Sequence, residues 1–99
     1  MSTVPVEFHP DAVDEAAAAR EWYQARSPSA ADAFVAELDR VIKRIRDNPT
    51  RWPSFVHGTR RYLLRKFPFQ VVYRLVGTTI QVIAVAHGQR KPGYWKTRR

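Results

Sequence analysis

The feature that most constrains the fold of this chain is a pair of alternating apolar segments joined by Gly77-Thr78. Residues 68–76 and 79–87 alternate between apolar and polar side chains, a period that is typical of β-strands. A two-residue link containing glycine favours a tight hairpin turn. If Val76 pairs with Thr79, the register of the whole hairpin follows.

This register gives the hairpin two different faces. One face is predicted to be continuous and apolar: Phe69, Val71, Tyr73, Leu75, Ile80, Val82, Ala84 and Ala86. The other is predicted to carry Gln70, Arg74, Gln81 and His87, with Val72, Ile83 and Val85 between them. A shift of one residue would bury Arg74 and His87, so we expect helices on the apolar face and an open working surface on the other.

The first half of the chain predicts a short strand followed by two helices. Residues 4–8 alternate like a strand, and Pro10 with Asp11 then opens a helix. Ser27 is a predicted N-cap with Pro28 in the first turn of a second helix. That helix has an apolar face of 3.6-residue period, consisting of Phe34, Leu38, Val41, Ile42 and Ile45. The short link between the helices predicts an antiparallel hairpin.

Residues 49–59 are predicted to form a loop that Trp52 and Phe55 pin to the core, and residues 60–66 a further strand. The expected architecture is therefore α+β: an N-terminal strand, an antiparallel two-helix hairpin, and a three-stranded antiparallel meander that completes a helix-backed sheet. The chain has 99 residues, enough for one compact domain, so we expect residues 1–99 to form a single domain. We expect the basic tail to be partly disordered beyond Trp95.

The charges are distributed unevenly along the chain. Residues 1–47 contain all nine acids and six basic residues, a net charge of −3, whereas residues 48–99 contain eleven basic residues and no acid, a net charge of +11. This polarity favours an anionic partner, either a polyanion or an acidic protein surface.

Several functional classes are excluded by composition. The chain has no cysteine, and its three histidines have no metal-ligand spacing, so we expect no metal and no cofactor. The longest apolar run, residues 82–86, is too short to span a bilayer, and residues 1–8 do not resemble a secretory signal. We expect a soluble cytoplasmic protein that does not contact membranes.

Three segments, in this order and at these distances, carry a resemblance to a known family: SPSAADAF, RRYLLRKFPFQVVYRL and IQVIAVAHGQRKPGYW. With the order of predicted elements, they resemble the RelE/ParE superfamily over residues 4–94, which includes plasmid stabilisation proteins. The resemblance implies the toxin of a type II toxin–antitoxin system, silenced by a cognate antitoxin. RelE-like members cleave mRNA on the ribosome without a metal, whereas ParE-like members inhibit DNA gyrase.

For ribosome-dependent mRNA cleavage, the mechanism that we expect, the resemblance implies five candidate catalytic residues. Arg65, Arg74 and Arg90 match positions of phosphate-binding cations, and His87 could transfer a proton near neutral pH. Tyr94 matches a tail position used for proton transfer or for stacking on a base. This hypothesis predicts that Arg65, Arg74, His87 and Arg90 converge on the open face of the sheet. A purely structural role for His87 remains an alternative.

Six further residues are candidates for contacting nucleic acid: Arg60, Arg61, Lys66, Lys91, Trp95 and Lys96. Two departures from the RelE-like pattern favour the gyrase alternative, which needs no active site. The paired lysines before the second strand are missing, with Thr59-Arg60-Arg61 as the nearest substitute, and no acid follows Asp47 to act as a base. A non-toxic basic module that binds nucleic acid is the second alternative.

Overall fold

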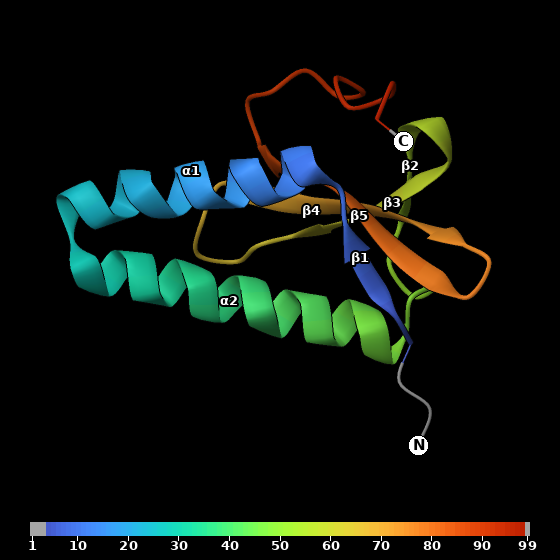
Figure 1. Cartoon of the computed structure of the whole chain (residues 1–99), viewed down its shortest axis with the longest axis horizontal. Helices are drawn as coiled ribbons and strands as arrows, with labels where there is room; N and C mark the ends of the chain where they lie inside the picture. The colour runs from blue at the N-terminus through green and yellow to red at the C-terminus, as the bar shows by residue number, and fades with distance from the viewer. Residues whose placement is uncertain (1–3, 99) are drawn as a thin grey trace.

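The computed structural model describes residues 4–98 and consists of two helices packed on one face of a five-stranded sheet (Figure 1). The strand order is β1-β5-β4-β3-β2. β1 (Val6–Phe8) is parallel to β5 (Thr79–His87), whereas β2 (Ser54–Phe55), β3 (Thr59–Leu63) and β4 (Phe69–Val76) are linked to their neighbours in antiparallel pairs. This arrangement confirms the predicted helix-backed α+β fold.

The two helices begin and end where local sequence signals predict. In α1 (Pro10–Arg26), the His9 Nδ1 atom accepts a hydrogen bond from the Asp11 N–H at 3.0 Å. In α2 (Pro28–Asp47), the Ser27 hydroxyl accepts one from the Ala30 N–H at 3.3 Å, as an N-cap does. The helices lie side by side and antiparallel (Figure 1). No helix within residues 4–98 has the length and apolar character needed to cross a lipid bilayer.

The main core lies between the helices and the sheet. α2 contributes three large, fully buried side chains, Phe34, Val41 and Ile45, as its 3.6-residue period predicts. Tyr73 of β4 is also buried, and its hydroxyl donates a hydrogen bond to the Pro49 carbonyl at 2.6 Å. Burial raises the pKa of Tyr73 to about 12, so this phenol stays protonated at neutral pH.

The hairpin register is as predicted near the turn but changes further along. Arg74 pairs with Gln81 and Tyr73 with Val82, whereas Val72 pairs with Ala84, so Ile83 is an extra residue that forms a β-bulge. Because side chains alternate between faces, the bulge exchanges the faces of all later residues of β5.

The predicted faces are therefore wrong beyond the bulge. Val85 packs in the core under the helices, and His87 contacts Phe69 on the same side. Ala84 and Ala86 lie instead on the outer face with Val72 and Ile83. At the hairpin tip, Leu75 is 39% exposed because it lies outside the main core.

The outer face is not open, which is a second correction. Trp95 is 1% exposed and packs with Phe55 in a small apolar layer over Val72, Ile83 and the two alanines. An apolar outer face requires such a cover, because an exposed sheet of valine, isoleucine and alanine would remain in contact with water. The sheet is therefore sandwiched between the helices and the C-terminal segment.

The loop between α2 and β3 contains a strand that periodicity does not reveal. Ser54 and Phe55 pair with Arg60 and Thr59 as β2, which is too short to show an alternating pattern. Trp52 and Phe55 pin this region as predicted, Trp52 against Tyr62 at a ring-centroid distance of 4.2 Å and Phe55 against Trp95 at 5.5 Å.

The C-terminal segment, residues 90–98, makes specific contacts with the rest of the fold, also beyond Trp95. Arg98 makes two hydrogen bonds with the Glu15 carboxylate, and the segment passes over the sheet toward β2 (Figure 1). Gly93 has φ +87°, and a Cβ atom there would lie 2.7 Å from His57 Nε2. Glycine therefore allows both the backbone conformation and the close approach.

Candidate functional site

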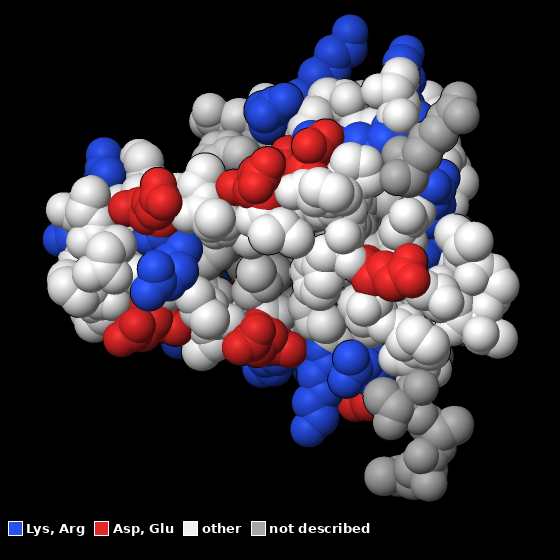
Figure 2. All heavy atoms as spheres, in the orientation of Figure 1, with Lys and Arg blue, Asp and Glu red and all other residues white. Residues whose placement is uncertain are grey.

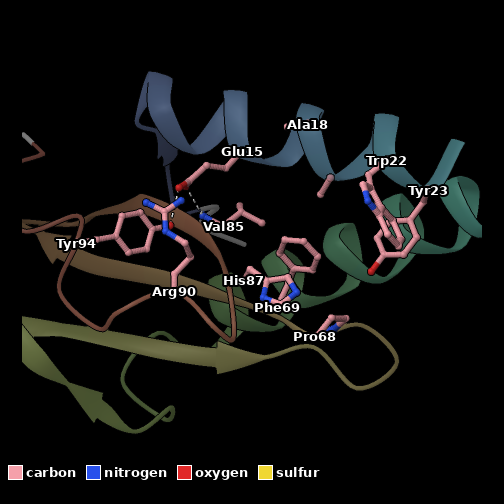
Figure 3. Close-up of a pocket in the computed structure, with 11 residues that line it drawn as sticks. Glu15, Ala18, Trp22, Tyr23, Pro68, Phe69, Val85, His87, Arg90 and Tyr94 are labelled. Atoms are coloured by element: carbon pink, nitrogen blue, oxygen red, sulfur yellow. Dashed lines mark hydrogen bonds between the residues drawn. The ribbon is translucent and has the colours of Figure 1, made fainter. Parts of the chain in front are cut away.

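One cavity lies between α1 and the end of β5. We call it the α1–β5 pocket; its volume is about 420 Å³ and its lining is mainly apolar. It is built from three parts of the chain (Figure 3). They are α1 (Glu15, Ala18, Ala19, Trp22, Tyr23), the β4–β5 region (Pro68, Phe69, Val85, His87) and the C-terminal segment (Arg90, Tyr94).

Small and large residues of α1 together create this pocket. Ala18 and Ala19 leave space beside the sheet, while Trp22 and Tyr23 close one end of the pocket (Figure 3). Trp22 is 52% exposed, and the Arg26 guanidinium lies 3.4 Å from its ring centroid. A half-exposed tryptophan beside a concave apolar surface is typical of a protein-binding site.

The opposite end of the pocket carries positive charge. Arg90 is exposed, and its guanidinium lies 3.9 Å from the Tyr94 ring centroid. The Tyr94 hydroxyl donates a hydrogen bond to Glu15 at 2.5 Å. Burial, followed by this hydrogen bond, raises the pKa of Tyr94 well above its usual value, so the phenol is a poor proton donor for chemistry.

His87 lies at the end of β5 and faces the helices. Its ring contacts Phe69 edge to face at 5.1 Å, and its Nδ1 atom accepts a hydrogen bond from the Gln89 N–H at 3.1 Å. That bond orders the turn after β5. These contacts agree with the alternative that His87 has a structural role. The other ring nitrogen, Nε2, takes no part in the bond to Gln89.

The candidate catalytic residues occupy three places. His87, Arg90 and Tyr94 share the α1–β5 pocket. Arg74 lies beside the β4–β5 turn, where its Nε donates to Gln81 Oε1 at 2.7 Å. Gln81 and His87 are six residues apart on β5, which corresponds to about 20 Å along an extended strand. Arg74 therefore does not meet His87 and Arg90 on the outer face of the sheet, contrary to what the ribonuclease hypothesis predicts.

Arg65 occupies the third place, beside α2. It follows β3 rather than lying within it, and it lines a separate cavity of about 700 Å³ with Arg40 and Lys66. The Glu37 carboxylate in this cavity is 7% exposed and accepts hydrogen bonds from the backbone N–H groups of Arg65 and Lys66. Glu37 thus attaches the β3–β4 connection to α2.

The candidates for nucleic-acid contact lie in different environments. Arg60 Nη1 donates to the Trp52 carbonyl at 2.6 Å, and the Arg61 guanidinium lies 4.2 Å from the Phe55 ring centroid. Trp95 is buried, so it has no free face on which a base could stack. Lys66, Lys91 and Lys96 are exposed. In Figure 2, acidic and basic side chains are interspersed over the helical face.

Sequence patterns alone did not identify Glu15 and Glu37, two acids whose carboxylates accept backbone hydrogen bonds from distant strands or turns. Both lie on helices where most acids face solvent. The signal that could have placed them near the core boundary is their spacing relative to buried helical positions, such as Ala12 and Ala19 or Phe34 and Val41.

The fold and pocket define a small α+β protein with a concave apolar surface suited to binding another protein. The family model described as ParE toxin of type II toxin-antitoxin system, parDE, matches residues 6–92. The chain therefore belongs to the ParE toxin family, within the RelE/ParE superfamily, and is the toxin of a type II toxin–antitoxin system. This membership implies an antitoxin as its partner.

Comparisons with individual proteins agree with this assignment. Toxin ParE2 from two Mycobacterium tuberculosis strains, CDC 1551 / Oshkosh and ATCC 25618 / H37Rv, is 29% identical over 85 residues, 85% of this chain and 81% of the relative. A solved chain of the chromosomal ParDE TA system from P. aeruginosa has a TM-score of 0.75 and 21% identity, covering 86% of this chain and 96% of its own. At that identity the match supports the fold.

Proposed function

We propose that this toxin inhibits growth by binding a protein target rather than by cleaving RNA, and that the target is DNA gyrase. The observation that carries the proposal is the separation of Arg65, Arg74 and His87 into three places. The sequence pattern favours the ribonuclease, but the arrangement of these side chains favours its alternative. Gyrase is the target that the ParE resemblance implies.

RNA cleavage needs a base, an acid and cationic groups within reach of one phosphate. In the α1–β5 pocket, the Tyr94 hydroxyl is occupied by Glu15, and the Nδ1 atom of His87 by the Gln89 N–H. Among the described residues that line the pocket, Arg90 is the one arginine or lysine, and it is exposed. Inhibition by binding requires no such constellation; it requires an accessible and complementary surface.

Induced expression in a bacterial host distinguishes the two mechanisms. We expect growth arrest and a DNA-damage response within minutes, with mRNA 5′ ends unchanged, and purified toxin should inhibit DNA supercoiling by gyrase. New cuts within translated regions that disappear in His87→Ala would contradict the proposal. Normal growth, with the protein present and folded, would favour the non-toxic nucleic-acid-binding alternative.

We further propose that the antitoxin occupies the α1–β5 pocket. A bulky apolar side chain would fill the space beside Ala18 and Trp22, and an acidic residue would pair with Arg90 at the rim. The outer face of the sheet is a poorer site for the antitoxin, because the C-terminal segment covers much of that face.

Substitution of Trp22 by alanine tests this site. The probe is the product of the small acidic reading frame that type II systems encode beside the toxin gene, titrated calorimetrically against the full chain. Loss of a half-exposed aromatic anchor should weaken binding at least tenfold while changing stability little. Val13→Ala, a 50% exposed position on the same helix outside the pocket, is the control and should bind normally. Equal affinities of the wild type, Trp22→Ala and Val13→Ala for this probe would place the antitoxin elsewhere.

A further inference from the structure

One carboxylate joins α1, the sheet and the C-terminal segment. Glu15 Oε1 accepts hydrogen bonds from the Val85 N–H at 3.0 Å and from Arg98 Nη1 at 2.8 Å. Its Oε2 accepts them from the Tyr94 hydroxyl at 2.5 Å and from Arg98 Nη2 at 3.1 Å. The Arg98 pair is bidentate, and the side chains of Glu15 and Arg98 are only 18% and 14% exposed.

Glu15 and Arg98 contact the part of β5 that lies beyond the end of β1. β1 pairs with residues 80–82 of β5 and then ends, so residues 83–87 have no strand on that side within the described chain. There, Glu15 accepts the Val85 N–H, and Arg98 Nη1 donates to the Ile83 carbonyl at 2.9 Å. Two side chains thus satisfy backbone groups that a further strand would otherwise bond, which ties the position of the C-terminal segment to the sheet edge.

The C-terminal segment also forms one end of the α1–β5 pocket. Arg90 and Tyr94 line that end, and the ring of Tyr94 supports the Arg90 guanidinium. Figure 3 shows Glu15 reaching from α1 toward Tyr94 and Val85, with Arg90 beside them. Arg98 does not line the pocket, yet it bonds to the same carboxylate as Tyr94. The pocket is therefore incomplete whenever the segment is detached.

We propose that Glu15 and Arg98 are positioning residues for antitoxin recognition, which act by holding the C-terminal segment so that Tyr94 and Arg90 complete the pocket. The inference rests on the proposed antitoxin site. If only the docked form binds, the apparent dissociation constant increases by the inverse of the docked fraction. Antitoxin binding should in turn increase docking, because the two equilibria are linked.

Arg98→Gln is the primary test. We expect at least tenfold weaker binding of the antitoxin, measured at a temperature where circular dichroism shows every variant folded. Amide exchange of residues 90–98 and of Val85 should be faster in the free variant and slower again on antitoxin binding. Arg98→Lys keeps the charge but not the bidentate geometry and should recover part of the affinity.

Two other variants complete the design. Glu15→Gln should resemble Arg98→Gln, because it removes the charge that both Arg98 nitrogens contact. Lys96→Gln removes a positive charge from an exposed position in the same segment and should bind normally. A simple net-charge effect would weaken Lys96→Gln and Arg98→Gln equally, and that result would overturn the inference.

The outcomes separate this inference from the proposed site. If Trp22→Ala weakens binding but Arg98→Gln does not, although its segment exchanges faster, the positioning role is wrong and the pocket stands. If neither variant weakens binding, the antitoxin does not use the pocket and both proposals fail. If Arg98→Gln alone weakens binding, the segment is recognised outside the pocket, which also overturns the inference. Weakening by both variants, with normal binding by Lys96→Gln, supports it.

Discussion

Phe34→Ala is expected to lower the free energy of unfolding by about 3–5 kcal/mol, the usual effect of deleting a buried aromatic ring. The Phe34 side chain is completely buried and lies 5.4–5.5 Å, between ring centroids, from Tyr23, Phe67 and Phe69. A domain of this size is stable by about 5–15 kcal/mol. Urea denaturation followed by circular dichroism measures the change, and the midpoint of thermal unfolding should fall by more than about 10 °C.

Phe8→Ala is the matched control for this prediction. It deletes the same ring from a position that is 40% exposed, at the short outer strand β1. We expect less than half the effect of Phe34→Ala, because less apolar surface is lost from the core. Equal effects at the two positions would show that the aromatic cluster between α2 and the sheet does not dominate stability.

Trp95→Ala is expected to cost about as much, roughly 3–5 kcal/mol, because Trp95 covers the outer face of the sheet. The side chain is 1% exposed and stacks on Phe55 with an interplanar angle of 28°. Its loss would expose Val72 and Ile83 to water as well as leave a cavity. Urea denaturation gives the free energy, and binding of a hydrophobic dye reports exposure of the outer face.

Two further variants identify the cause of this loss. Trp22→Ala makes the same substitution at a 52% exposed position and should cost about 1 kcal/mol or less. Trp95→Phe should cost much less than Trp95→Ala, because the buried Trp95 Nε1 has no hydrogen-bond partner in the described chain and phenylalanine removes this donor. A Trp95→Ala protein as stable as the wild type would mean that the outer layer contributes little.

Much of the fold could be predicted because its signals are local. The Ser27 cap, Pro28 and the apolar period of α2 depend on contacts within a few residues, and the Gly77-Thr78 turn depends on two. The bulge at Ile83 could not be predicted in this way, because both registers of the following residues place apolar side chains on both faces of the hairpin. Such a pattern leaves the register weakly specified.

The candidate site was only partly predictable for a related reason. His87, Arg90 and Tyr94 are close in sequence and do lie together. Arg65 and Arg74 were placed with them by resemblance. Arg74 lies beside the β4–β5 turn, far along the strand from His87, and the β-bulge turns His87 toward the helices. The backbone of Arg65 is bonded to Glu37 of α2. Glu15 contacts residues 70 to 83 positions away, so no local pattern could show its role.

The amino-acid sequence by itself therefore determined the helices, the hairpin turn and the order of the elements, because caps, turn residues and periodicity act over short distances. It also carried the family resemblance that the family model confirms. The tertiary structure alone decided which face of β5 each later residue occupies, what covers the outer face, and that Glu15, Tyr94 and Arg98 meet. These features arise from packing and hydrogen bonds between residues that are far apart in the sequence, and only the folded chain brings those residues together.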